Sequence, residues 1–114
     1  SSSSRGLGDV YKRQVIKAPS YVNNQAAEAI AEEGNRLIGE GVVHLVLNLA
    51  ESKMVNSVGI AIIIEVIDNA TEKGGSLNFC CVSPTIEKTF QIMGLKQLAG
   101  IFEDESSALA SINA

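Results

Sequence analysis

Hydrophobic and polar positions change their period repeatedly along this chain, and each change predicts a new element. Residues 15–18 form a short apolar strand, and a helix follows from Asn23 or Asn24 to about Ile38 with apolar residues at helical spacing. Residues 42–49 are a nearly continuous run of β-branched residues and leucine, which is typical of a central strand covered on both faces. A second helix is predicted from near Ser57 to the Gly74-Gly75 pair.

The C-terminal third of the chain continues the alternation. Residues 77–82 form another strand, and Ser83 and Pro84 have the cap and first-turn chemistry of a third helix that ends at Gly94. A short strand near residues 101–102 precedes a last helix over residues 104–112. The sequence therefore predicts a small α/β domain whose sheet is built largely from crossover connections and is flanked by helices.

The first fourteen residues show no apolar period, and their last six, DVYKRQ, resemble the translated end of a transposon adaptor used in sequencing libraries. We expect residues 1–14 to be a non-native, adaptor-derived segment and residues 15–114 to be the domain; whether its N-terminal strand is missing stays open. The segment carries two arginines and one lysine against one aspartate, so without it the net charge changes from −4 to −6.

This acidic balance leaves no basic stripe for a phosphate backbone, so no direct nucleic-acid partner is predicted. The longest apolar run, residues 60–67, is interrupted by Glu65 and is far shorter than the roughly 20 residues of a membrane span. The N-terminus also lacks the apolar region of a signal peptide. We therefore expect no membrane span and a cytoplasmic location.

Cys80 and Cys81 are neighbours in a predicted strand, where successive side chains point to opposite faces. The pattern predicts inert, buried thiols that form neither an ordinary disulfide nor a shared metal site. His44, the single histidine, lies inside a predicted strand without a cysteine cluster or HExxH motif, which favours a structural role. No metal and no cofactor are predicted.

A short polar segment, residues 56–59, separates an apolar strand from the isoleucine-rich second helix. Ser57 lacks the glycine two positions earlier that an esterase elbow needs, and Gly59 stands without the other glycines of a phosphate loop, so no enzyme is predicted. A phosphate on Ser57 would be tolerated, because the unpaired N–H groups and the positive dipole end of the helix converge there. Two interpretations stay open: Ser57 only caps the helix, or it is a phosphorylation switch.

The second helix has more isoleucine than one buried stripe requires. We expect some of these side chains to be exposed beside Ser57 and to form a docking patch, with Ile60 and Ile64 as its members. The alternative is that neighbouring helices cover them.

Several motifs occur in one order from about Val15 to the C-terminus: LVLNL, MVNSVGI, EKGGSLNF, VSPTIEKTFQIMGL and IFEDESSAL. Together they resemble the STAS domains of the anti-sigma factor antagonist type, and an ordered set over most of the chain is far more specific than any single motif. The resemblance implies a small STAS-type fold with a mixed, mostly parallel β-sheet flanked by about four helices.

The resemblance also implies a function without catalysis. Such a protein binds a GHKL-type anti-sigma factor serine kinase, frees the sigma factor, and is turned off when the kinase phosphorylates the motif serine, here Ser57. A monomer or weak dimer is expected. The implied partner-binding residues, with the first two placed by analogy of fold, are Asn23, Asn24, Asn56, Ser57, Val58, Gly59, Ile60 and Ile64.

Two positions depart from the family motif: Asn56 stands where the motif has aspartate, and Val58 stands where it has a second hydroxyl residue. An amide donates as well as accepts hydrogen bonds and carries no charge, so recognition by a kinase could differ. The alternative function is therefore a non-phosphorylated STAS scaffold or a sensory module of a larger regulatory assembly.

Overall fold

The computed structural model describes residues 13–112, whose strands form two sheets. The larger sheet has the order β1-β3-β5-β6 and the smaller one pairs β2 with β4, and every pairing between these strands is parallel. The strands are β1 (Arg13–Lys17), β2 (Tyr21–Val22), β3 (His44–Asn48), β4 (Met54–Val55), β5 (Ser76–Cys80) and β6 (Ile101–Phe102).

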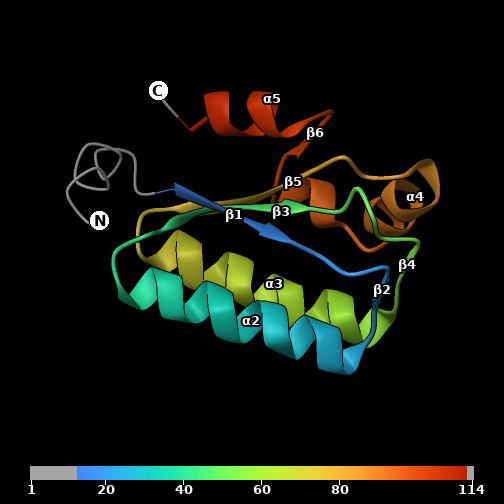
Figure 1. The fold of residues 1–114 in the computed structure, drawn as a ribbon, viewed down its shortest axis with the longest axis horizontal. Helices are drawn as coiled ribbons and strands as arrows, with labels where there is room; N and C mark the ends of the chain where they lie inside the picture. Colours follow the sequence, from blue (N-terminus) through green and yellow to red (C-terminus); the bar gives the residue numbers. More distant parts are fainter. Residues whose placement is uncertain (1–12, 113–114) are drawn as a thin grey trace.

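Helices cover both faces of the larger sheet. Because the strand order runs in one direction, successive right-handed crossovers place α2 and α3 on the same face, where they lie side by side, and α5 lies on the other (Figure 1). The helices are α2 (Asn24–Gly39), α3 (Ser57–Glu72), α4 (Pro84–Ile92), the 3-10 helix η1 (Leu95–Gln97) and α5 (Glu105–Ala110). The predicted α/β fold with a mostly parallel sheet is thus confirmed.

The strands divide their side chains between two cores. Leu45, Leu47 and Phe79 belong to the larger core, which the sheet shares with α2 and α3, whereas Val46 and Cys80 belong to a smaller core together with Ala108 of α5. Burial on both faces explains why β3 is apolar without alternation. None of the helices in the described part of the chain is long and apolar enough to cross a membrane.

The helices begin close to the predicted residues, whereas several strands do not begin or end where they were predicted to. The Asn23 side chain caps α2 by accepting a hydrogen bond from the Ala26 amide at 2.9 Å, and Ser83 caps α4. β1 begins at Arg13, which is paired with His44, and so starts two residues before the predicted strand. The adaptor-derived origin of residues 1–14 stays a prediction, and residues 1–12 lie outside the described part of the chain.

The end of β5 corrects the prediction for the two cysteines. The strand stops at Cys80, and Cys81 has a left-handed backbone with φ of 61°. Its side chain packs against the same small core as Cys80 rather than on the opposite face. Strand alternation therefore gave the wrong face for Cys81, because the residue lies beyond the strand.

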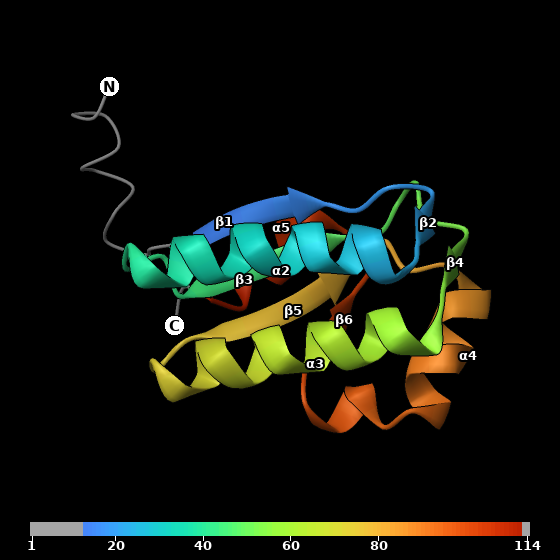
Figure 2. The same ribbon diagram turned by 90° about the horizontal axis from the view of Figure 1, so that it is seen from below.

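The small β2–β4 sheet was not predicted, because two residues are too few to show a strand period. Tyr21 pairs with Met54 and Val22 with Val55, and Val22 and Val55 are buried. Each strand leads within two residues into a helix, β2 into α2 and β4 into α3. The sheet therefore brings the starts of these two helices to the same end of the molecule (Figure 2).

Candidate functional site

Asn56 holds the start of α3 and connects it to the start of α2. Its Oδ1 accepts a hydrogen bond from the Gly59 amide at 2.6 Å, and its Nδ2 donates to Asn24 Oδ1 at 3.3 Å. Neither α2 nor α3, as the structure describes them, has an acidic residue in its first turn. The positive ends of both helix dipoles therefore lie at one site without a carboxylate of their own first turns to offset them.

Ser57 is the first residue of α3, and its side chain is exposed. The interpretation that Ser57 merely caps the helix is wrong, because Asn56 is the N-cap residue and supplies the capping oxygen. Within residues 13–112, the Ser57 hydroxyl has no hydrogen-bond partner. The hydroxyl is thus accessible to a modifying enzyme, and its modification would not break the cap.

Gly59 is buried where the first turn of α3 approaches β2. A Cβ atom at this position would lie 2.9 Å from the Val22 carbonyl oxygen and 3.1 Å from Asn56 Oδ1. Any larger residue would therefore press against both the backbone of β2 and the capping side chain. Gly59 supports the site through this close approach.

The expected exposure of isoleucines beside Ser57 is wrong for Ile60. Ile60 is fully buried, and Ile64 is half-buried against the larger core. The helix carries so many isoleucines because it contacts the sheet on one side and α2 along another. Neighbouring elements thus cover Ile60 fully and Ile64 in part, and a role of Ile64 in partner binding stays a prediction.

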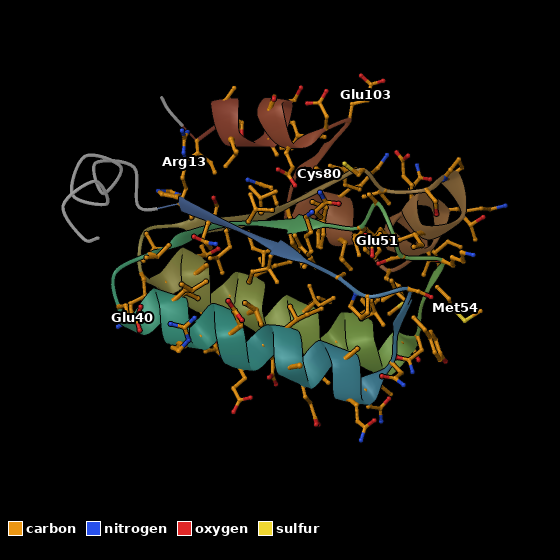
Figure 3. All side chains as sticks on the ribbon, in the orientation of Figure 1. Arg13, Glu40, Glu51, Met54, Cys80 and Glu103 are labelled. Carbon is orange, nitrogen blue, oxygen red and sulfur yellow. The ribbon has the colours of Figure 1, made fainter. Side chains whose placement is uncertain are left out.

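Other apolar side chains are exposed near Ser57. Tyr21 is 47 % exposed, Met54 56 % and Val58 46 %. Tyr21 and Met54 are register partners in the β2–β4 sheet, so their side chains leave the same face, and Met54 points away from the molecule (Figure 3). We use the name Ser57 surface for Tyr21, Asn24, Met54, Ser57 and Val58.

Sequence reasoning found three of these five residues and missed Tyr21 and Met54. Asn23 caps α2, whereas Asn24 is exposed and accepts a hydrogen bond from Asn56, and the partner-binding role of both residues stays a prediction. His44 lies away from this end, with its Nδ1 3.2 Å from Ser76 Oγ. Among the described residues no group of three or more histidine, cysteine, aspartate or glutamate side chains could hold a metal ion.

Two substitutions of Asn56 should show how much each of its two hydrogen bonds contributes to stability. We expect Asn56→Ala to lower the free energy of unfolding by about 1 kcal/mol, because the cap of α3 is lost. Asn56→Asp should cost less, since a carboxylate still accepts from the Gly59 amide and is favoured at a helix N-terminus. Urea unfolding followed by circular dichroism measures both changes.

Asn69→Ala is the matched control, because it removes a second asparagine pair between α3 and α2, a 2.9 Å bond to Asn35, without touching a cap. An Asn56→Ala protein as stable as Asn69→Ala would contradict the capping role.

A model of the STAS domain family matches residues 8–108. The chain belongs to this family. A curated relative, the anti-sigma F factor antagonist of Paenibacillus polymyxa, is 28 % identical over 69 residues, which cover 60 % of this chain and 59 % of the relative. The match thus spans less than two thirds of that relative's length.

Two solved structures have the same STAS fold. A candidate anti-sigma factor antagonist of Thermotoga maritima, TM1081, has a TM-score of 0.81 and 14 % identity over 90 % of this chain and 89 % of that one. The phosphorylated form of the Bacillus cell fate determinant SpoIIAA has a TM-score of 0.72 and 20 % identity over 90 % of this chain and 93 % of that one. At these identities the likeness concerns the fold.

Proposed function

We propose that this STAS protein is an anti-sigma factor antagonist that binds a GHKL-type anti-sigma serine kinase and is switched off by phosphorylation of Ser57. The observation that carries the proposal is the exposed, unbonded Ser57 hydroxyl at the first position of α3, beside the start of α2. The names of the P. polymyxa relative and of the phosphorylated Bacillus structure support it.

Electrostatics favour a phosphate at this position. A phosphoserine carries about −1.5 to −2 charges, and negative charge is stabilised at a helix N-terminus. Here the start of α2 adds a second positive dipole end, and neither first turn in the described structure has its own carboxylate. Because Asn56 keeps the cap bond to Gly59, the phosphate can be added without unfolding α3.

The unmodified Ser57 surface suits an apolar partner. Tyr21, Met54 and Val58 are about half exposed, and the polar members, Asn24 and Ser57, are uncharged. Docking of the kinase would bury the three apolar side chains. In this proposal the protein has no catalytic activity and regulates transcription in the bacterial cytoplasm without contacting DNA.

The second candidate is a non-phosphorylated STAS scaffold or sensory module within a larger regulatory assembly. The hydrogen bond from Asn56 Nδ2 to Asn24 favours it, because an ionised aspartate could not donate this bond. The site would then be an uncharged, prearranged docking surface with no need for modification.

The test is the intact mass of the protein after incubation with ATP and candidate anti-sigma kinases from the same genome neighbourhood. We expect one phosphate on the unaltered protein and on Ser106→Ala, which removes another exposed serine near a helix start, and none on Ser57→Ala. Phosphate on Ser57→Ala would overturn the assignment of the site. Tight binding without any phosphate would favour the scaffold.

A further inference from the structure

Cys80 and Cys81 form a pair of thiols on one face of the sheet. Along β5, Leu77 and Phe79 face the larger core and Cys80 faces the smaller core under α5. An extended Cys81 would face the larger core again. Its left-handed backbone instead turns its side chain toward the same small core as Cys80.

Neighbouring strands hold this unusual turn in place. The Leu49 amide donates to the Cys80 carbonyl at 3.0 Å, and the Cys81 amide donates to the Phe102 carbonyl at 3.2 Å. Cys81 is the only non-glycine residue with a positive φ in the described part of the chain, a conformation that residues with a side chain rarely adopt. The surrounding sheet therefore keeps both side chains in the same small core, against the intrinsic backbone preference of Cys81.

The two thiols differ in access. Cys80 is fully buried, whereas Cys81 is half-buried. Burial, followed by the hydrogen bond and charge of Cys81, raises the pKa of the Cys80 thiol to about 12. A reagent reaches Cys81 first, because Cys81 is the more exposed thiol. Cys80 reacts second, because the thiolate is the nucleophile and a raised pKa keeps Cys80 protonated.

We propose that Cys80 and Cys81 are a redox-active dithiol that closes into a disulfide between adjacent residues when it meets a low-molecular-weight disulfide. The Cys81 thiolate attacks one sulfur of the oxidant, so a mixed disulfide forms and the first thiolate leaves. The Cys80 sulfur then attacks the Cys81 sulfur and expels the second thiolate, which takes up the proton that the Cys80 thiol loses. Two protein thiols are oxidised and one small disulfide is reduced to two thiols.

The test uses the full chain, reduced and then incubated with oxidised glutathione, denatured, and alkylated with N-ethylmaleimide. Intact mass should show the loss of two hydrogen atoms and no alkylation, in a protein that remains a single chain without reductant. Cys80→Ser should stop at a glutathione adduct, and Cys81→Ser should resist the oxidant. Two free thiols, a persistent adduct or linked chains in the unaltered protein would each overturn the proposal.

A second measurement tests the geometry without oxidation. Phenylarsine oxide binds through two sulfur atoms that lie together, so the native protein should take up one equivalent and either serine variant none. This readout is independent of the proposed kinase and of Ser57. Absence of uptake by the folded, unaltered protein would place the sulfurs too far apart and contradict the dithiol.

Discussion

In the proposed function, phosphorylation of Ser57 should weaken binding to the anti-sigma kinase by about 100-fold or more, which corresponds to about 2.7 kcal/mol. The phosphate would be added next to Val58 in the sequence, and Val58, Tyr21 and Met54 are the exposed apolar side chains of the Ser57 surface that a partner must cover in this proposal. A partner must then either remove water from the multiply charged phosphate or leave the apolar side chains unburied. Both reduce its affinity. Calorimetric titration of the two forms against the kinase measures the difference.

Two variants test this expectation further. Ser57→Asp places one charge closer to the backbone than a phosphate and should lose only part of the affinity, while Ser57→Ala should keep binding when ATP is present. Raised salt should change the affinity of the unmodified form little, because the Ser57 surface is uncharged. Equal affinity of the phosphorylated and unmodified forms would exclude a phosphorylation switch.

Features that depend on one residue's own chemistry could be predicted from the sequence. Asn23 and Ser83 cap helices because their short polar side chains reach backbone amides two or three residues later. The apolar run around β3 was recognisable because both faces of the strand are buried. These local signals were sufficient for the α/β fold.

Features that arise when distant segments meet could not be predicted in the same way. The hydrogen bond between Asn56 and Asn24 exists because β2 and β4 pair, and neither strand is long enough to show a pattern. The burial of Ile60 depends on the tertiary packing of α3, which the helix sequence alone does not contain. The sequence therefore pointed to Ser57 and Val58 of the candidate site but not to Tyr21 and Met54, which the β2–β4 pairing places there.

Gly75→Ala should be the most damaging single substitution that we predict for stability, with a loss of roughly 3 kcal/mol or more. Gly75 lies between α3 and β5, where a Cβ atom would be 2.0 Å from the Val43 carbonyl oxygen and 2.5 Å from its carbonyl carbon. The Val43 carbonyl also accepts the Ser76 amide at 3.0 Å, so moving this backbone would open the start of the β3–β5 pairing.

Gly39→Ala is the matched control, because a Cβ atom there has nothing within 4 Å and the residue ends α2. Alanine is the better helix former by up to about 1 kcal/mol, so this variant should be neutral or slightly more stable. Urea unfolding of both variants separates the general effect of replacing glycine from the backbone collision. Equal stability of the two variants would mean that the α3–β5 turn can shift, and that the contact of Gly75 with Val43 does not limit the fold.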